Sequence, residues 1–193
     1  MFLENTINHA KQSGWMEVIC GSMFSGKTEE LIRRLRRAEM AGQKVEIFKP
    51  KLDVRYAEAD VVSHNQTKIR STPVESPNEI LLLGLTCDVV GIDEAQFFDE
   101  SIVDVANLLA NSGIRVVIAG LDMDFMGRPF GPIPNLMATA EYVTKVHAIC
   151  KRTGNLANYS MRISASKDLV ELGEMESYEA VSRKVFNEEF LNR

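Results

Sequence analysis

The sequence is poor in cysteine, tryptophan and proline. Its 193 residues include only one tryptophan, six prolines and three cysteines, Cys20, Cys87 and Cys150. An odd number of cysteines so far apart in the sequence excludes a disulfide framework and is typical of a reducing compartment. We therefore expect a cytoplasmic location. Hydrophobic residues make up 45% of the chain, which is enough for a packed core without disulfides.

Long apolar runs and an excess of positive charge are also missing. No stretch approaches the roughly 20 apolar residues that cross a bilayer, and residues 1–14 lack the apolar segment of a signal peptide. We expect these residues to form a flexible leader, and we expect no membrane partner. The net charge is −5. Because binding nucleic-acid phosphates requires a surplus of Lys and Arg, we expect no nucleic-acid partner, although a local anion site is compatible with this charge.

Short apolar segments alternate with amphipathic ones from residue 15 to residue 121. The amphipathic segments, residues 28–42 and 98–113, have helical spacing; Asp99 is a predicted cap for the second, and Gly42 and Gly113 end the two helices. The apolar, strand-like segments are residues 15–20, 44–50, 87–93 and 115–121. Strands that alternate with helices predict an α/β fold with a parallel sheet covered on both faces.

The pattern changes beyond residue 121. Residues 122–135 are rich in Gly and Pro and predict a loop, and residues 135–143 predict a further helix. Residues 145–164 predict two short strands about a turn at Gly154, and residues 178–193 predict a polar terminal helix. Earlier in the chain, residues 51–77 predict a long functional loop, with a short strand within residues 69–76. We place a domain boundary near Lys145.

Residues 21–28, GSMFSGKT, match the phosphate-binding pattern G-x-x-x-x-G-K-[ST]. The pattern follows a predicted strand and opens a predicted helix, so backbone N–H groups and the helix N-terminus would face negative charge. Lys27 would contact the β- and γ-phosphates of ATP, and Thr28 would hold Mg²⁺. The alternative is a Gly-rich turn that binds no ligand. The predicted ATP-binding residues here are Gly21, Ser22, Met23, Phe24, Ser25, Gly26, Lys27 and Thr28.

The apolar run at residues 89–92 ends in two adjacent carboxylates, Asp93 and Glu94, as a Walker B segment does. Because neighbouring residues of a strand point to opposite faces, one carboxylate can hold Mg²⁺ while the other faces the acceptor. The alternative is the start of a helix with two acidic residues. The first interpretation predicts a RecA-like P-loop sheet flanked by helices, with a nucleotide-binding domain over residues 15–144 and a small domain over residues 145–193.

Two groups of charged residues allow more than one interpretation. Arg33, Arg34, Arg36 and Arg37 occupy helix positions that the apolar stripe leaves to solvent, so we expect a solvated face or a subunit contact. The segment 51–56 follows the second strand, at the sheet edge where α/β folds bind ligands. Arg55 could clamp a phosphate there and Asp53 could assist Mg²⁺, but an ordinary charged loop explains this segment equally well.

Four blocks of the sequence together resemble the type II thymidine kinase family, the cytosolic and bacterial type. The blocks are GSMFSGKTEELIRR, PKLDVRY, VVGIDEAQFF and IAGLDMDFMGRPFGPI, and the resemblance runs from about Trp15 to the C-terminus. It implies transfer of the ATP γ-phosphoryl group to the 5′-hydroxyl of thymidine, giving dTMP in nucleotide salvage. Acceptance of deoxyuridine stays open. The resemblance also implies a homotetramer.

The resemblance assigns roles to individual residues. Glu94 would be the general base, assisted in catalysis by Lys27 and Arg55, and Mg²⁺ would lie among Thr28, Asp53 and Asp93. The ATP-binding segment would extend over Asp93, Glu94, Ala95 and Gln96. The substrate-binding residues would be Met23, Phe97, Leu121, Phe125, Phe130, Ser160 and Tyr178, with a lasso loop over about residues 163–178. Without the resemblance, core packing would be the simpler explanation of the phenylalanines.

The C-terminal part departs from the family in one respect. Members of the family usually carry a structural zinc held by two Cys-x-x-Cys pairs. Here Cys150 is retained, whereas Thr153, Ser182 and Val185 stand at the other three positions. Because a structural zinc needs four N or S ligands, we expect no zinc and a small domain held by packing alone.

Two other functions are compatible with a P-loop. One is an ATPase or switch that hydrolyses its nucleotide, and the other is a nucleotide-binding protein without turnover, which the missing zinc ligands suggest. The sequence lacks the Asn-Lys-x-Asp signature of GTPases, and the Phe-rich segment 122–130 favours a nucleobase pocket over a switch. The intact Lys27, Thr28, Asp93 and Glu94 argue against a protein without turnover.

Overall fold

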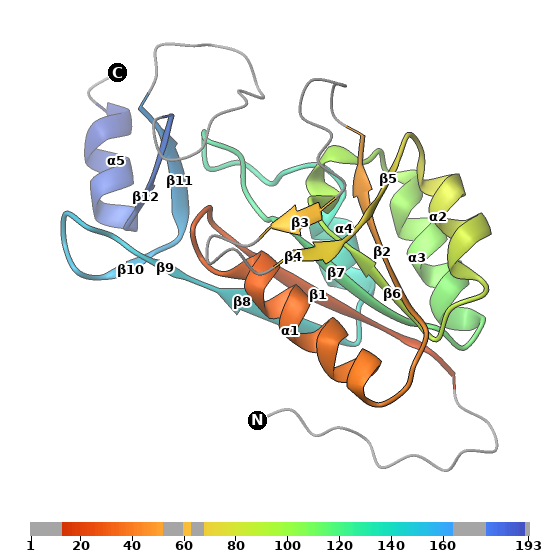
Figure 1. Ribbon diagram of the computed structural model, residues 1–193. Coiled ribbons are helices and arrows are strands. Elements are labelled where there is room, and N and C mark those ends of the chain that lie inside the picture. Colours follow the sequence, from red (N-terminus) through yellow and green to blue (C-terminus); the bar gives the residue numbers. More distant parts are fainter. Residues whose placement is uncertain (1–12, 52–59, 63–67, 164–176, 192–193) are drawn as a thin grey trace.

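The computed structural model describes residues 13–51, 60–62, 68–163 and 177–191. A parallel sheet of six strands lies at its centre, in the order β5-β2-β6-β7-β1-β8 (Figure 1). The predicted α/β fold with a parallel sheet is confirmed. The strands are β1 (Trp15–Gly21), β2 (Val45–Pro50), β5 (Thr72–Val74), β6 (Val89–Ile92), β7 (Arg115–Leu121) and β8 (Tyr142–Val146).

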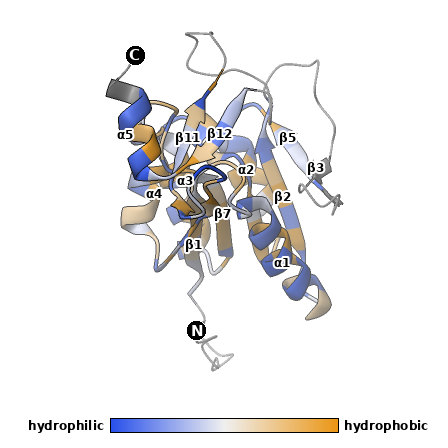
Figure 2. Ribbon diagram, turned by 90° about the vertical axis from the view of Figure 1, so that its left-hand side faces the viewer, coloured by the Kyte–Doolittle hydropathy of each residue, from blue (hydrophilic) through white to orange (hydrophobic). Residues whose placement is uncertain are grey.

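Helices cover both faces of the sheet. Alternate residues of a strand enter opposite cores, so Val116 and Ile118 of β7 pack in one cluster and Val117 and Ala119 in the other. The second cluster lies under α1, and the first lies under α2, α3 and α4. Figure 2 shows the apolar strands in the middle and many hydrophilic residues along α1. The helices are α1 (Lys27–Met40), α2 (Pro77–Gly84), α3 (Ser101–Asn111) and α4 (Ile133–Thr139).

The helix ends follow the local sequence signals. Gly42 (φ 77°) and Gly113 (φ 91°) adopt the left-handed conformation just beyond α1 and α3, as predicted. Glu100 is the N-cap of α3, one residue after the predicted cap Asp99, whose carboxylate accepts a hydrogen bond from the N–H of Ser101 at 2.9 Å. Helix α2 was not predicted from the sequence, although Ser76 and Glu79 form a capping box at its start.

Short antiparallel strand pairs lie outside the main sheet. They are β3 (Asp60–Val62) with β4 (Lys68–Arg70), β9 (Ala148–Ile149) with β10 (Leu156–Ala157), and β11 (Tyr159–Arg162) with β12 (Tyr178–Val181). The predicted hairpin about Gly154 is therefore confirmed. Helix α5 (Arg183–Leu191) lies beside β11 and β12 (Figure 1). The strands β9 to β12 and helix α5 share a hydrophobic core, which we call the C-terminal cluster. It consists of Ala148, Cys150, Ala157, Tyr159, Met161, Ala180, Val181, Val185 and Phe186.

Two segments differ from the expectation. The predicted helix over residues 135–143 is wrong beyond Thr139, because Tyr142–Val146 forms β8 and pairs with β1. Its aromatic and β-branched residues suit an edge strand better than a helix. The main sheet ends at Val146, close to the boundary placed near Lys145. The predicted terminal helix begins too early, since residues 178–181 form β12 and the helix starts at Arg183.

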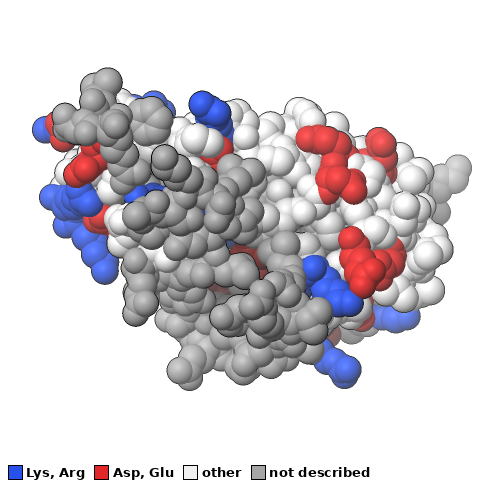
Figure 3. All heavy atoms as spheres, turned by 90° about the horizontal axis from the view of Figure 1, so that it is seen from above, with Lys and Arg blue, Asp and Glu red and all other residues white. Residues whose placement is uncertain are grey.

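The charged side chains that the structure describes are distributed in small groups. Figure 3 shows Lys and Arg separated by Asp and Glu on the face seen from above, rather than one continuous basic surface among the described residues. None of the helices in the described ranges combines the length and apolar character that a membrane crossing requires.

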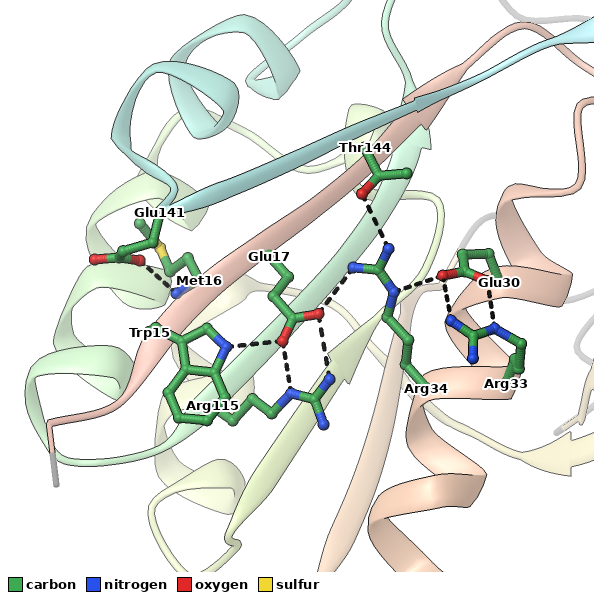
Figure 4. A network of polar contacts seen from close by, with 9 residues as sticks. All are labelled: Trp15, Met16, Glu17, Glu30, Arg33, Arg34, Arg115, Glu141 and Thr144. Carbon is green, nitrogen blue, oxygen red and sulfur yellow. Dashed lines mark hydrogen bonds and ion pairs between the residues drawn. The ribbon is translucent and has the colours of Figure 1, made fainter. Parts of the chain in front are cut away.

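One arginine of α1 is buried, contrary to expectation. Arg33, Arg36 and Arg37 are exposed as predicted, but the side chain of Arg34 is only 4% exposed. It donates hydrogen bonds to Glu17 at 2.8 Å and to Glu30 at 2.8 Å (Figure 4). The prediction of a fully solvated arginine face is therefore wrong at Arg34, because an acid on β1 lies beneath the helix.

Glu17 is the centre of this buried network (Figure 4). Its carboxylate also accepts hydrogen bonds from Arg115 at 2.7 Å and from the indole of Trp15 at 2.7 Å. Arg34 reaches the hydroxyl of Thr144 on β8 at 3.0 Å. Burial by itself raises the pKa of Glu17, but the hydrogen bond and charge of Arg115, the hydrogen bond from Trp15 and the charge of Arg34 outweigh it and lower that pKa. The network thus joins α1 to three adjacent strands of the sheet.

Candidate active site

The P-loop joins β1 to α1 in a tight conformation. Gly21 (φ 147°) has no room for a side chain, because a Cβ there would lie 2.1 Å from the carbonyl oxygen of Val146. Phe24 adopts φ 62° and Gly26 φ 83°. The carbonyl oxygen of Ser22 accepts hydrogen bonds from Lys27 Nζ at 2.8 Å and from Ser25 Oγ at 2.7 Å. The predicted loop residues therefore form one compact turn at the end of β1.

Lys27 lies among acidic side chains. Burial lowers the pKa of its ammonium group, and the charges of Glu94, Asp93 and Asp122 act in the opposite direction. The Walker A and Walker B segments are therefore close enough to interact electrostatically. A cation held in this position can neutralise bound phosphates.

Thr28 and Asp93 connect the two segments directly. The hydroxyl of Thr28 donates a hydrogen bond to Asp93 Oδ2 at 3.3 Å. Burial and the neighbouring charge of Glu94 raise the pKa of Asp93 to about 7, so its ionised form lacks sufficient counter-charge. A divalent cation would supply that charge, and hydroxyl and carboxylate oxygens are ligands that suit Mg²⁺. The residues present therefore fit the predicted metal.

Glu94 differs from Asp93 in exposure and in backbone conformation. Asp93 is buried, whereas Glu94 is exposed. Glu94 adopts the left-handed conformation, φ 52° and ψ 37°, which costs a non-glycine residue about 1–3 kcal/mol. Such strain occurs most often at functional sites. The two adjacent carboxylates thus have different environments, as different roles require.

Ala95 and Gln96 follow in a 3₁₀ turn, Ala95–Phe97, and both are buried. The side-chain amide of Gln96 donates a hydrogen bond to Glu94 Oε2 at 2.5 Å. Its oxygen accepts a hydrogen bond from the backbone N–H of Leu121 at 2.9 Å. The family resemblance places Gln96 in the ATP-binding segment but does not indicate its contact with Leu121, which lies far along the chain on β7.

The P-loop is attached to the C-terminal strands. Ser22 Oγ donates a hydrogen bond to the carbonyl of Ala157 at 3.1 Å, and the N–H of Met23 donates to Ser160 Oγ at 2.9 Å. The ring of Phe24 packs against the C-terminal cluster. Two predicted substrate residues, Met23 and Ser160, are therefore in direct contact.

Aromatic residues of the predicted substrate set lie in two groups. Phe97 and Phe130 meet edge to face, with ring centroids 5.7 Å apart. Phe125 lies under the guanidinium of Arg162, whose carbon is 3.9 Å from the ring centroid. Arg162 also donates a hydrogen bond to the hydroxyl of Tyr178 at 2.5 Å. Arg162 thus links Phe125 to Tyr178, and no sequence pattern singled it out.

The segment 122–130 owes its shape to two buried aspartates that the sequence analysis did not assign. Asp124 accepts hydrogen bonds from the N–H groups of Met126 at 2.8 Å and Arg128 at 2.9 Å. Asp122 forms an ion pair with Lys145 at 2.7 Å. The contacts of Asp124 thus shape the segment internally, and the pair of Asp122 with Lys145 ties its first residue, just after β7, to β8.

Some of the predicted site residues lie outside the described residues. They are Asp53, Arg55 and most of the lasso loop, residues 164–176. The described substrate residues are therefore Met23, Phe97, Leu121, Phe125, Phe130, Ser160 and Tyr178.

The four positions that correspond to zinc ligands in the family come together. Thr153 Oγ1 donates a hydrogen bond to Ser182 Oγ at 3.4 Å, and Cys150 and Val185 belong to the C-terminal cluster. Burial raises the pKa of Cys150, but hydrogen bonds from the Thr153 side chain and from backbone N–H groups outweigh it and lower the pKa to about 7. Within the described ranges, no group of three or more His, Cys, Asp or Glu residues is placed to hold a metal.

A P-loop on a parallel sheet, joined through Thr28 to an acid at the end of the Walker B strand β6, defines a P-loop nucleotide-binding protein. The chain also matches the sequence profile described as thymidine kinase over residues 14–186. It belongs to the thymidine kinase family, whose reaction is the ATP-dependent phosphorylation of thymidine. The resemblance found in the four sequence blocks is confirmed.

Relatives named thymidine kinase are similar over most of their length. The protein from Rhodothermus sp. (strain ITI 518) is 59% identical, covering 93% of this chain and 84% of the relative. The protein from Bacteroides fragilis (strain YCH46) is 57% identical, covering 96% and 94%. The protein from Porphyromonas gingivalis (strain W83) is 58% identical, covering 95% and 90%.

Among solved structures, the genome packaging NTPase B204 from Sulfolobus turreted icosahedral virus 2 overlays with a TM-score of 0.47 and 14% identity. The overlay covers 74% of this chain and 78% of that one. A likeness at this level adds nothing to the assignment of the family.

Proposed function

We propose that this chain transfers the γ-phosphoryl group of ATP to the 5′-hydroxyl of thymidine and produces dTMP and ADP. Membership of the thymidine kinase family supports the reaction. The observation that carries the catalytic assignment is the arrangement of Thr28, Asp93 and Glu94. Thr28 and Asp93 are hydrogen-bonded, and Glu94 is the exposed carboxylate next to them.

Each part of the arrangement has one task in the reaction. The acceptor hydroxyl attacks the γ-phosphorus, its proton passes to Glu94, and the bond to the bridging oxygen of ADP breaks. Lys27 and the N–H groups of the P-loop stabilise negative charge on the phosphates. Mg²⁺, held by Thr28 and Asp93, would neutralise further phosphate charge. ATP binding is assigned to residues 21–28 and to Asp93, Glu94, Ala95 and Gln96.

Further parts of the site are proposed from the family resemblance. Arg55 would assist catalysis at the phosphates, and Asp53 would help to hold Mg²⁺. The thymidine site would consist of Met23, Phe97, Leu121, Phe125, Phe130, Ser160 and Tyr178, closed by the lasso loop. The contact between Phe97 and Phe130 and the grouping of Phe125 with Tyr178 support this set.

Four further properties belong to the proposal. The family resemblance supports a homotetramer, and the shortage of cysteine supports a cytoplasmic location. Nucleotide salvage is the process that thymidine phosphorylation serves. Deoxyuridine is an alternative acceptor, since it differs from thymidine only by a methyl group on the base.

The test measures ADP formation by the purified chain with ATP and Mg²⁺, with and without thymidine, and identifies the nucleoside product by chromatography. A kinase forms ADP only with thymidine and forms an equal amount of dTMP. ADP formation at the same rate without thymidine would instead indicate an ATPase, and no ADP under either condition would indicate a binding protein. Lys27→Met provides the inactive control.

A further inference from the structure

We propose that Gln96 is a positioning residue for the reaction. Its side-chain amide fixes the carboxylate of Glu94 and ties it to the backbone of Leu121, where the nucleoside-binding segment begins. The inference rests on the proposed function, in which Glu94 is the general base and Leu121 borders the thymidine site.

Both ends of the Gln96 amide are used. Nε2 donates a hydrogen bond to Glu94 Oε2, and Oε1 accepts one from the N–H of Leu121 at 2.9 Å. The residue is 3% exposed, whereas the Glu94 that it holds is exposed. These two contacts fix the orientation of the amide, because its NH₂ group faces a carboxylate and its oxygen faces an N–H group.

Two glycines in adjacent segments of the same chain leave room for Gln96. A Cβ at Gly120 would lie 2.9 Å from Gln96 Oε1 and 2.5 Å from Cδ1 of Ile133. A Cβ at Gly131, which adopts φ 49°, would lie 2.4 Å from the carbonyl oxygen of Gln96. Gln96 is therefore enclosed between the end of β7 and the chain that follows the segment 122–130.

This arrangement solves a problem for an exposed base. A free glutamate side chain samples many rotamers, and ordering it during the reaction costs conformational entropy. With Oε2 held by Gln96, the carboxylate has its orientation set in advance and its other oxygen, Oε1, can accept the proton of the acceptor hydroxyl. Placing a catalytic group in advance is worth large factors in rate, and a displacement of about 1 Å can cost about a hundredfold.

The same amide joins the base to the wall of the nucleoside site. Leu121 begins the chain that carries Phe125 and Phe130, and Phe97, the residue after Gln96, contacts Phe130. A shift of this wall would therefore move the amide and with it Glu94. The arrangement aligns the base with the nucleoside that it must deprotonate.

The substitution Gln96→Glu separates the two contacts. A glutamate has the same length and keeps an oxygen that accepts from the N–H of Leu121, but it places a carboxylate against Glu94 where the donor was. We expect kcat with thymidine to fall about 10- to 100-fold. If Gln96 only supported the segment 122–130, the retained acceptor would leave kcat unchanged.

The matched control is Gln43→Glu, which makes the same change of charge in an exposed turn after α1 and should leave kcat and both KM values unchanged. Should Gln96→Glu fail to fold, as judged by thermal unfolding, Gln96→Met replaces it, since it is neutral, similar in size and lacks both hydrogen bonds. A fall in kcat of at least tenfold in the folded variant supports the inference, and a kcat within twofold of the parent overturns it.

A double-substitution cycle tests whether Gln96 acts through Glu94. In the Glu94→Gln background, Gln96→Glu should cause no further loss of single-turnover rate, because the base is already gone. Losses that multiply would show that Gln96 acts on something else and would overturn the inference. The parent chain is assayed first: if it does not phosphorylate thymidine, the proposed function fails, whereas an active parent with equally active Gln96 variants refutes only this inference.

Discussion

The guanidinium of Arg34 lies 2.8 Å from the carboxylate of Glu17, and both side chains are at least 96% buried. Glu17 belongs to β1, which ends at the P-loop, and Arg34 belongs to α1, which begins there. The ion pair therefore joins the two elements on either side of the phosphate-binding loop. Removing one partner of such a pair leaves the other charge buried with fewer opposite charges around it. The resulting loss of folding free energy is large.

Arg34→Met should lower the free energy of unfolding by about 3–5 kcal/mol, because Glu17 loses one of its two arginine partners in a buried site. Denaturation by urea, followed by circular dichroism, measures this change. Arg33→Met is the matched control on the adjacent position of the same helix. Its side chain is 54% exposed, so its pair with Glu30 should be worth about 1 kcal/mol or less. Equal effects of the two substitutions would contradict the account.

The acids of this network should make stability depend on pH in the acidic range. Hydrogen bonds from Arg33 and then from Arg34, together with their charges, lower the pKa of Glu30 from 4.5 to about 2, although burial opposes the shift. Because the pKa is lower in the folded state, the unfolded chain takes up the proton first. This stabilisation is therefore complete above pH 4.5 and is lost as the pH falls from 4.5 to about 2.

Glu30→Gln should accordingly reduce the dependence of unfolding free energy on pH in that range. Urea denaturation at several pH values between about 5 and 3 measures the slope for parent and variant. A slope that is unchanged in Glu30→Gln would show that Glu30 has the same pKa in the folded and unfolded chain.

Arg162 should control affinity for the nucleoside rather than for ATP. Its guanidinium lies over Phe125 and donates to the hydroxyl of Tyr178, so it positions two proposed thymidine-binding residues. Arg162→Lys keeps the charge but loses the planar group that covers the ring. We expect the KM for thymidine to rise about tenfold and the KM for ATP to stay within about twofold.

Steady-state kinetics with each substrate varied in turn measures both values. The control is Arg152→Lys, since Arg152 binds Glu179 and Glu189 at the surface of the C-terminal strands and should leave both KM values unchanged. Equal increases in the two KM values for Arg162→Lys would indicate general damage to the fold.

The C-terminal cluster should gain a zinc site when its missing thiols are supplied. Cys150 lies with Thr153, Ser182 and Val185, so Thr153→Cys, Ser182→Cys and Val185→Cys together should provide four sulfur ligands. We expect about one zinc per chain in the triple variant and none in the parent, measured by inductively coupled plasma mass spectrometry. Zinc in the parent at one ion per chain would contradict the expectation that this chain carries no structural zinc.

The sequence predicts those parts of the molecule whose chemistry lies in adjacent residues. The P-loop and the Walker B acids are contiguous motifs. The contact of Thr28 with Asp93 follows because β1 and β6 are parallel strands on either side of β7, so their carboxyl ends lie at the same edge of the sheet. The burial of Arg34 was missed, because its spacing on α1 is that of a solvated residue and its partner Glu17 lies on another element. The contacts of Gln96 with Leu121 and of Arg162 with Phe125 and Tyr178 were missed for the same reason.

Strand β8 shows a second limit of predicting secondary structure from the sequence. Tyr142 and Val143 follow a helical segment closely, and the sequence pattern continues the helix through them. What makes them a strand is the free edge of β1, to which β8 pairs from Glu17 to Gly21. Pairing with a distant segment is a tertiary effect that outweighs local propensity.

The fate of the γ-phosphoryl group tests the central claim most directly. Purified chain is incubated with ATP labelled in the γ-position, Mg²⁺ and thymidine, and the labelled product is identified, for the parent and for Glu94→Gln. We predict that the parent places the label on thymidine as dTMP, and that Glu94→Gln lowers this rate by orders of magnitude while ATP affinity is nearly unchanged. Label released as inorganic phosphate whether or not thymidine is present, or full transfer by Glu94→Gln, would contradict the account.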